Sequence, residues 1–182
     1  MRVIAGTAKG LRLATPKAEN IRPVLDQVKE AIFNILFDVT DLKVLDLFAG
    51  TGAIGIEALS RGAAFAEFVD DSREALKLIG TNLQKCGFET KAEVLKMKAA
   101  MAIKRLESSG KTFDLVFVDP PYEGRYIKKT LLRLAKSALI HSDSIIITEH
   151  HPKEPIGEIE GLILTDERKY GQTLVSFLKK KS

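Results

Sequence analysis

Apolar residues follow two different periods that alternate along the chain. Short β-rich runs occur at residues 44–48, 66–70, 92–95, 115–118 and 144–148. The longer stretches between them carry apolar residues at helical spacing, at residues 53–61, 72–86, 99–107 and 126–138. Strands that alternate with helices of this length are typical of a parallel sheet with crossover helices on its faces. The pattern therefore predicts an α/β fold.

The last two apolar runs are arranged differently. No helix-length segment separates residues 162–165 from residues 173–178, so these two strands are expected to pair antiparallel at one end of the sheet. Together with the earlier runs, they predict a seven-stranded, Rossmann-like sheet that is mostly parallel and contains one antiparallel strand.

The chain before the first core strand has a pattern of its own. Residues 2–5 and 11–14 form two short extended pieces around a glycine-containing turn, which suits a β-hairpin. A helix is expected after Leu25, where apolar residues recur at helical spacing. We therefore divide the chain into an N-terminal hairpin arm, residues 1–23, and a main domain, residues 24–182.

Composition narrows the class of protein. A chain of 182 residues with 45% hydrophobic content can form one globular domain. The single cysteine, Cys86, excludes an internal disulfide, and the three histidines are too scattered to predict a metal site. No apolar run approaches the ~20 residues that span a bilayer, and the first residues lack the apolar centre of a signal peptide. We therefore expect a soluble, cytoplasmic protein without a metal.

The formal net charge of +4 is compatible with a phosphate-bearing partner, although enzymes with small anionic substrates have similar charges. The placement of the basic residues is more informative, because they crowd the first segment, where only Glu19 opposes them. These basic residues are Arg2, Lys9, Arg12, Lys17 and Arg22. The hairpin arm is therefore a candidate nucleic-acid contact.

A glycine-spaced turn directly follows the first core strand. Gly50 and Gly52 allow the backbone to pass close to a ligand, and Gly55 allows the next helix to pack tightly on the sheet. The free N–H groups at the start of that helix favour an anionic group. We therefore expect the turn to bind a ligand. Its other contact residues are Phe48, Ala49 and Thr51.

Acidic residues stand on both sides of this turn. Asp46 lies in the strand ahead of the first glycine, which argues against a dinucleotide site. Asp70 lies 18 residues beyond Gly52 at the end of the second strand, where a carboxylate can accept the hydroxyl hydrogens of a ribose. Asp71 is the second choice for this contact. The alternative for Asp70 is a helix cap, although Ser72 suits that position better.

The fourth predicted strand ends in the sequence Asp119-Pro120-Pro121-Tyr122. Open α/β sheets bind their ligands at the carboxyl ends of the strands. Two consecutive prolines lack backbone donors and restrict the residues before them, so this turn is stiff and presents carbonyl oxygens. An acceptor-rich pocket of this kind suits an amino group.

An exocyclic amine on a nucleobase is a poor nucleophile, because its lone pair is delocalised into the ring. The Asp119 carboxylate and the Pro120 carbonyl could each accept one N–H and free the lone pair, while Tyr122 stacks on the base. This motif resembles the Asn/Asp-Pro-Pro-Tyr/Phe signature of amino-group methyltransferases. The stretch Asp46 to Gly52 resembles the turn that wraps the amino-acid end of S-adenosylmethionine in such enzymes.

Further stretches resemble the RsmD-type family of bacterial rRNA guanine-N2 methyltransferases. They are residues 2–6, 11–16, 22–23, 30–36, 50–62 and 170–172. This resemblance implies a class I methyltransferase fold that binds S-adenosylmethionine. It also implies methylation of one guanine of small-subunit (16S) rRNA, in assembled or nearly assembled 30S subunits, by a protein that we expect to be a monomer. The residues that would hold RNA are Arg2, Lys9, Arg12 and Arg22.

Two features depart from the family pattern. Val24 stands where a threonine is common, and Met97-Lys98 replaces a Gly-Asp pair that reaches the adenine amino group. Lysine cannot accept that hydrogen bond, and a neutral hydrogen bond is worth about 0.5 to 1.5 kcal/mol. We therefore expect Met97 and Lys98 to lie at the cofactor and to bind it more weakly. Arg125, in the loop after the Pro-Pro turn, is a candidate phosphate contact.

Three alternatives stay open. The turn from Asp119 to Tyr122 does not distinguish target bases, so an adenine-N6 or cytosine-N4 DNA methyltransferase is one, although the chain has no room for a separate target-recognition domain. Methylation of a protein glutamine amide is another, less suited to the basic arm. The third is a non-catalytic RNA-binding protein that keeps the fold. Lys98 and Val24 favour this alternative, because they depart from the family pattern, whereas the intact turn from Asp119 to Tyr122 argues against it.

Overall fold

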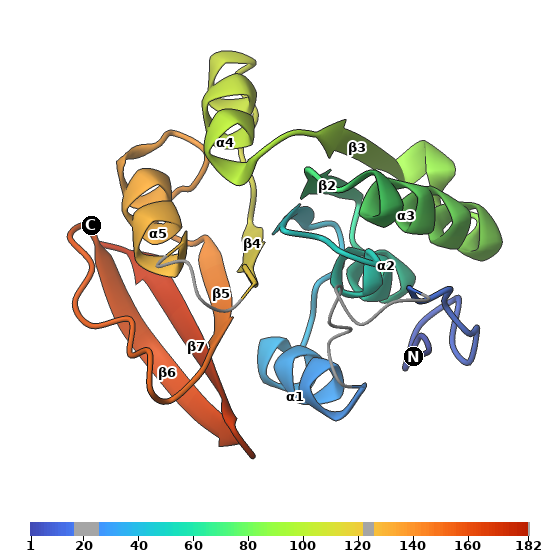
Figure 1. Ribbon diagram of the computed structural model, residues 1–182, viewed down its shortest axis with the longest axis horizontal. Helices are drawn as coiled ribbons and strands as arrows, with labels where there is room; N and C mark the ends of the chain where they lie inside the picture. The colour runs from blue at the N-terminus through green and yellow to red at the C-terminus, as the bar shows by residue number, and fades with distance from the viewer. Residues whose placement is uncertain (17–25, 122–125, 182) are drawn as a thin grey trace.

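The computed structural model describes residues 1–16, 26–121 and 126–181. Within these residues, seven strands form one sheet in the order β3-β2-β1-β4-β5-β7-β6 (Figure 1). The strands are β1 (Lys43–Leu47), β2 (Phe65–Asp70), β3 (Ala92–Lys96), β4 (Leu115–Val118), β5 (Ile145–His150), β6 (Leu162–Tyr170) and β7 (Thr173–Lys180). Strands β1 to β5 pair in parallel, whereas β7 runs antiparallel to both β5 and β6. The predicted sheet, with its one antiparallel strand, is confirmed.

Strand β6 is longer than the sequence pattern predicts. The apolar run ends at residue 165, but β6 continues through the polar residues Asp166, Glu167, Arg168 and Lys169 to Tyr170. β6 is the edge strand, and its polar half is held by pairing with β7 rather than by burial. Polar and charged side chains are what an exposed edge strand requires to avoid pairing with other chains.

Helices cover both faces of the sheet. They are α1 (Asp26–Leu36), α2 (Ala53–Ser60), α3 (Arg73–Cys86), α4 (Ala99–Ser108) and α5 (Tyr126–Lys136), with a short 3₁₀ helix at Glu89–Lys91. The first three pack on one face and α4 and α5 on the other (Figure 1). Each prediction for a helix between the core strands ends within about two residues of the observed one, which is the usual uncertainty of helix ends. None of these helices is long and apolar enough to cross a membrane, within the described part of the chain.

The alternation of side chains along each strand produces two separate cores. Phe68 and Phe117 point to the face covered by α1 to α3, whereas the neighbouring residues Val69, Val116 and Val118 point to the face covered by α4 and α5. Strands buried on both faces explain why the sequence shows nearly continuous apolar runs rather than an alternating pattern.

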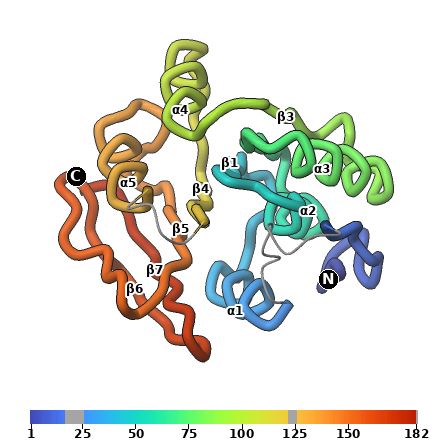
Figure 2. Tube along the Cα trace, viewed as in Figure 1, coloured from blue at the N-terminus to red at the C-terminus, as the bar shows by residue number. Residues whose placement is uncertain are grey.

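The first residues pack against the main domain as a small hairpin. Its antiparallel pairing consists of a single bridge between Arg2 and Arg12, so the two predicted extended pieces do not form regular strands. Val3 and Leu13 are buried in the core beneath α1 to α3. Figure 2 shows the hairpin beside α2 and α3, where the Asn82 amide bonds both backbone groups of Ala14. The division between arm and domain stays a prediction, since the two share one core.

Candidate active site

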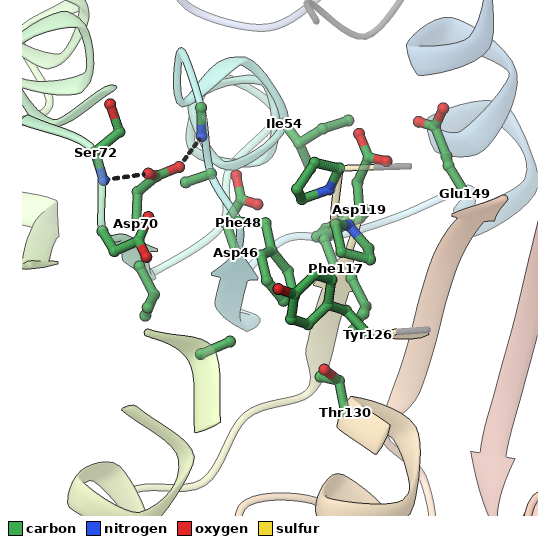
Figure 3. A pocket seen from close by; sticks show the side chains of 18 of the residues that line it. Asp46, Phe48, Ile54, Asp70, Ser72, Phe117, Asp119, Tyr126, Thr130 and Glu149 are labelled. Carbon is green, nitrogen blue, oxygen red and sulfur yellow. Dashed lines mark hydrogen bonds between the residues drawn. The ribbon is translucent and has the colours of Figure 1, made fainter. Parts of the chain in front are cut away.

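A cavity of about 1330 Å³ opens at the carboxyl ends of the parallel strands. Residues that follow β1, β2, β3 and β4 line it together with residues of β5, and α1 and α5 contribute to its walls. This is the edge at which open α/β sheets bind ligands. Figure 3 shows side chains from the ends of β1, β2, β4 and β5 that meet around this space.

The turn after β1 has an unusual backbone. Phe48, Gly50 and Gly52 all have positive φ angles, of 75°, 56° and 77°. Positive φ is rare for a residue other than glycine, so Phe48 is strained. Two hydrogen bonds stabilise this strained conformation: the N–H groups of Phe48 and Ala49 both donate to the Val69 carbonyl, at 3.0 and 2.9 Å. The adjacent strand β2 thus fixes the shape of the turn.

Gly55 permits the close approach of α2 to the sheet, as the sequence predicts. A β-carbon at this position would lie 2.4 Å from the ring of Phe68. No side chain fits there unless the Phe68 ring or the helix shifts. The free N–H groups at the start of α2 are held at the cavity by this packing.

Asp70 connects the end of β2 to the glycine turn. One carboxylate oxygen accepts the Gly50 N–H at 2.9 Å, and the other accepts the Ser72 N–H at 2.9 Å (Figure 3). The capping side chain of α3 is Ser72, whose hydroxyl accepts the Ala75 N–H. Asp70 therefore faces the cavity, and its remaining lone pairs are available for the hydroxyl groups of a ribose.

Asp46 is almost fully buried at the end of β1, with 5% of its surface exposed. Its carboxylate accepts the Gly55 N–H at 3.3 Å. Burial is the main cause that raises the pKa of Asp46 to about 7; the Gly55 hydrogen bond opposes this shift, and the charges of Asp119 and Asp70 contribute to it. A carboxyl group in this state gains from a cationic ligand, such as an ammonium group.

The Asp-Pro-Pro turn lies beside the glycine turn because β4 pairs with β1. Leu47 and Val118 are partners in this register, so the residues that follow each of them emerge next to each other. Asp119, Pro120 and Pro121 all line the cavity. The predicted contacts Tyr122, Arg125 and Arg22 lie outside the described residues.

Nearly all the predicted cofactor residues line this one cavity, and Gly52 is the exception. Those that line it are Asp46, Phe48, Ala49, Gly50, Thr51, Asp70, Asp71, Met97 and Lys98. Gly52 instead precedes α2 and shapes the turn. Lys98 is the N-cap residue that precedes α4, and its side chain makes no capping hydrogen bond. The weaker cofactor binding expected from Lys98 stays a prediction.

The sequence interpretation missed other residues of the cavity. Glu149 follows the predicted fifth strand by one residue, and the rule that ligands bind at the carboxyl ends of strands could have found it. Tyr126 and Thr130 reach the cavity from the first turn of α5 (Figure 3). Val28 and Ile32 of α1 form an apolar wall. No sequence signal links α1 to the site, because that contact depends on tertiary packing.

The described residues fit S-adenosylmethionine. The cavity has an apolar wall and a glycine turn that approaches closely, and Asp46 and Asp70 offer carboxylates for an ammonium group and a ribose. No group of three or more His, Cys, Asp or Glu side chains among residues 1–16, 26–121 and 126–181 could hold a metal ion. The fold and the site define the class of protein, which is a class I methyltransferase that uses S-adenosylmethionine.

Comparison with known proteins identifies the family. The family model described as "Conserved hypothetical protein 95" matches residues 1–179. YlbH of Bacillus subtilis, named as a candidate rRNA methyltransferase, is 36% identical over the full length of both chains. The ribosomal RNA small subunit methyltransferase D of Escherichia coli is 33% identical, over 82% of this chain and 74% of that protein. The chain belongs to this RsmD-type family.

The solved structures agree with this assignment. The structure of yhhF from Escherichia coli covers 100% of this chain and 98% of its own, with a TM-score of 0.87 and 28% sequence identity. The agreement extends over the N-terminal hairpin and the antiparallel end of the sheet, because the whole chain is covered.

Proposed function

We propose that this protein transfers a methyl group from S-adenosylmethionine to the exocyclic N2 amino group of one guanine in small-subunit rRNA. The Escherichia coli relative is named as a methyltransferase of small-subunit ribosomal RNA, which supports an rRNA substrate. The observation that carries the proposal is the register between β1 and β4, which brings the cofactor turn and Asp119 to the same edge of the sheet. An amine held at Asp119 then lies next to the bound cofactor.

The chemistry requires an activated amine. Bound S-adenosylmethionine supplies an electrophilic methyl group on its sulfonium sulfur. The Asp119 carboxylate accepts one N2 hydrogen and the Pro120 carbonyl accepts the other, which frees the nitrogen lone pair for in-line attack. Transfer of the methyl group from sulfur to nitrogen would leave S-adenosylhomocysteine and release one proton from the nitrogen, and we propose Asp119 as the acceptor of that proton. We assign base stacking to Tyr122 and a phosphate contact to Arg125, in keeping with the sequence prediction.

The test is the transfer of labelled methyl to small subunits from cells that lack this gene, followed by nucleoside identification. Wild-type protein is expected to place the label in N2-methylguanosine. Asp119→Ala should lower transfer by about 100-fold or more, because an oriented acceptor of the transition state is lost. It should retain most of its RNA affinity. Asp143→Ala, at an exposed aspartate, is the matched control and should keep full transfer.

The other outcomes are informative. Label in N6-methyladenosine or N4-methylcytosine would contradict the assignment to guanine and favour the DNA-methyltransferase alternative. RNA binding by wild-type protein without any transfer would indicate a binding protein that keeps only the fold. Loss of both transfer and RNA binding in the Asp119 variant would mean that this side chain supports the fold rather than the reaction.

We infer that the protein acts as a monomer on assembled or nearly assembled 30S subunits. One small domain offers few RNA contacts, so the folded shape of the substrate has to supply much of the selectivity. In the same assay, assembled subunits are therefore expected to be methylated much faster than naked rRNA. Equal rates on the two substrates would overturn this part of the proposal.

A further inference from the structure

Glu149 and Asp119 lie next to each other at the carboxyl ends of two paired strands. Val118 of β4 and Thr148 of β5 are partners in the parallel register, and each carboxylate residue follows its partnered residue by one position. Adjacent strands are about 4.8 Å apart. Both residues line the cavity, and Figure 3 shows their side chains directed the same way.

The position of Glu149 is set by the pleat of β5. Ile147, two residues earlier, packs in the core beneath α1, so Glu149 points to the same face of the sheet. Its backbone pairs with Val175 of β7 on the other side. Thr173 and the α1 residue Ile32 line the same cavity. Glu149 therefore lies at the α1 side of the proposed base-binding position, and Asp119 lies between it and the cofactor turn.

The Glu149 carboxyl is the group in this pair for which the described residues supply no hydrogen-bond donor. No hydrogen bond or ion pair joins the Glu149 carboxyl to any residue within 1–16, 26–121 or 126–181. Burial and the Asp119 charge raise the pKa of Glu149 to about 8. A ligand edge that carries several N–H groups would stabilise the ionised form of Glu149 and lower this pKa. The ionised carboxylate would in turn disfavour a base that presents a ring acceptor at the same place.

Guanine is the base whose edge matches these acceptors. Its N1–H and the two N2 hydrogens give three adjacent donors, whereas adenine and cytosine place an unprotonated ring nitrogen beside their exocyclic amine. The Asp119 carboxylate and the Pro120 carbonyl account for the two N2 hydrogens in the proposed function. The N1–H is left without a partner by those two groups alone.

We propose that Glu149 accepts the guanine N1–H and thereby selects guanine over other bases that carry an exocyclic amine. This inference rests on the proposed function, since it assigns a partner to the ring nitrogen next to the methylated amine. Glu149 is a specificity-determining residue that touches the substrate, distinct from the amine-orienting role of Asp119.

The test replaces the target guanine by 2-aminoadenine in reconstituted small subunits. This analogue keeps the N2 amine but has an acceptor at N1. The reactions are run at a pH above the Glu149 pKa of about 8, so that the carboxyl group is ionised. Wild-type kcat/KM should then be about 10- to 100-fold higher for guanine than for the analogue, because the Glu149 carboxylate would face the unprotonated N1 of the analogue, which is also an acceptor. In Glu149→Ala the rate on guanine should fall, and the preference should shrink to within about threefold.

Two further variants separate a substrate contact from a structural role. Glu149→Gln keeps the size of the side chain and can donate to the analogue N1, so its preference for guanine should also shrink while its thermal stability stays near that of wild type. Glu158→Gln, at an exposed glutamate away from the cavity, should keep the wild-type preference.

An unchanged preference in both Glu149 variants, with N2-methylguanosine still the product, would overturn the assignment of Glu149 alone. A wild-type product other than N2-methylguanosine would overturn the proposed function and this inference with it. The two failures are therefore distinguishable from one set of reactions.

Discussion

At the scale of single residues, Asp46 carries an electrostatic cost, because its carboxyl group is buried. The side chain is buried at the end of β1, and its carboxylate accepts a hydrogen bond from the Gly55 N–H in α2. Burial of a carboxylate is unfavourable unless a cation or enough donors compensate. The sequence analysis assigns Asp46 to the cofactor site, and the fold buries its carboxylate at a cost in free energy. Strongly perturbed ionisable groups of this kind are common at functional sites.

This cost predicts a pH-dependent stability. Burial raises the pKa of Asp46 from its ordinary value of 3.8 to about 7. Between these values the folded protein keeps a proton that the unfolded chain has released, so the free energy of unfolding falls as the pH rises from about 4 to about 7. Asp46→Asn keeps an acceptor for the Gly55 N–H but has no proton to lose.

We therefore expect the Tm of Asp46→Asn, measured by calorimetry, to exceed that of wild type by a margin that grows across this pH window and levels off above it. Glu149 titrates in both proteins, so its contribution cancels in the difference. A margin that is independent of pH would show that Asp46 ionises in the folded protein as it does in the unfolded chain.

At the scale of elements, one buried ion cluster joins the hairpin, α1 and α2. Lys29 and Glu57 are both fully buried and lie 3.4 Å apart, and Arg61 contacts the same carboxylate at 2.8 Å. The two oxygens of Glu57 also accept the N–H groups of Ile4 and Ala5. Glu57 thus satisfies donors from three segments that are distant in sequence.

Removal of one partner from such a cluster leaves a buried charge uncompensated. We expect Glu57→Ala to lower the free energy of unfolding by about 3 to 5 kcal/mol, as measured by urea denaturation. The control Glu30→Ala, at an exposed position of α1, should change it by no more than about 0.5 kcal/mol. A loss of less than about 1 kcal/mol for Glu57→Ala would mean that water replaces the carboxylate in the variant.

The elements that the sequence predicts well are those that local physics determines. The central strands are buried on both faces, and α3, α4 and α5 are buried on one face, so their apolar patterns are visible in the sequence. Ser72 can be predicted as a helix cap from its position alone. Lys29 is the opposite case. It occupies a polar position of an amphipathic helix, yet it is fully buried, because Glu57 and the Arg2 carbonyl from other segments compensate its charge.

The same distinction applies to the site. The glycine turn and the Asp-Pro-Pro turn are contiguous in sequence, so their residue types identify them. Glu149 and the α1 wall contribute to the cavity only through strand order and packing. The position of Glu149 after an apolar run can indicate a residue at the ligand-binding edge of the sheet, but it does not indicate the proposed role, which depends on Asp119, 30 residues earlier in the chain.

At the scale of the whole molecule, the hairpin is a fixed platform rather than a loose arm. Asn82 of α3 bonds Ala14 of the hairpin and also donates to the Thr51 carbonyl in the cofactor turn, at 2.9 Å. The hairpin and the cofactor turn thus share one support. A rigid connection of this kind can fix the distance between a bound RNA backbone and the methyl donor.

The basic side chains of this platform are exposed, which suits the proposed RNA contact. Lys9 and Arg12 both project from the hairpin surface. In a plot of the logarithm of RNA affinity against the logarithm of salt concentration, each phosphate contact that is lost should reduce the magnitude of the slope by about 0.7 to 0.9. We expect Lys9→Ala and Arg12→Ala each to show this change in filter binding to small-subunit rRNA, with no change in Tm.

Lys104→Ala provides the control, because Lys104 is an exposed lysine on α4, on the opposite face of the sheet from the helices that carry the hairpin (Figure 1). It removes the same charge from the molecule and should leave the salt dependence unchanged. If all three variants reduced the slope equally, the net charge of the protein would govern RNA binding. A reduction confined to Lys9 and Arg12 would place the phosphate backbone on the hairpin, on the side of the sheet where the α1 wall and Glu149 face the cavity.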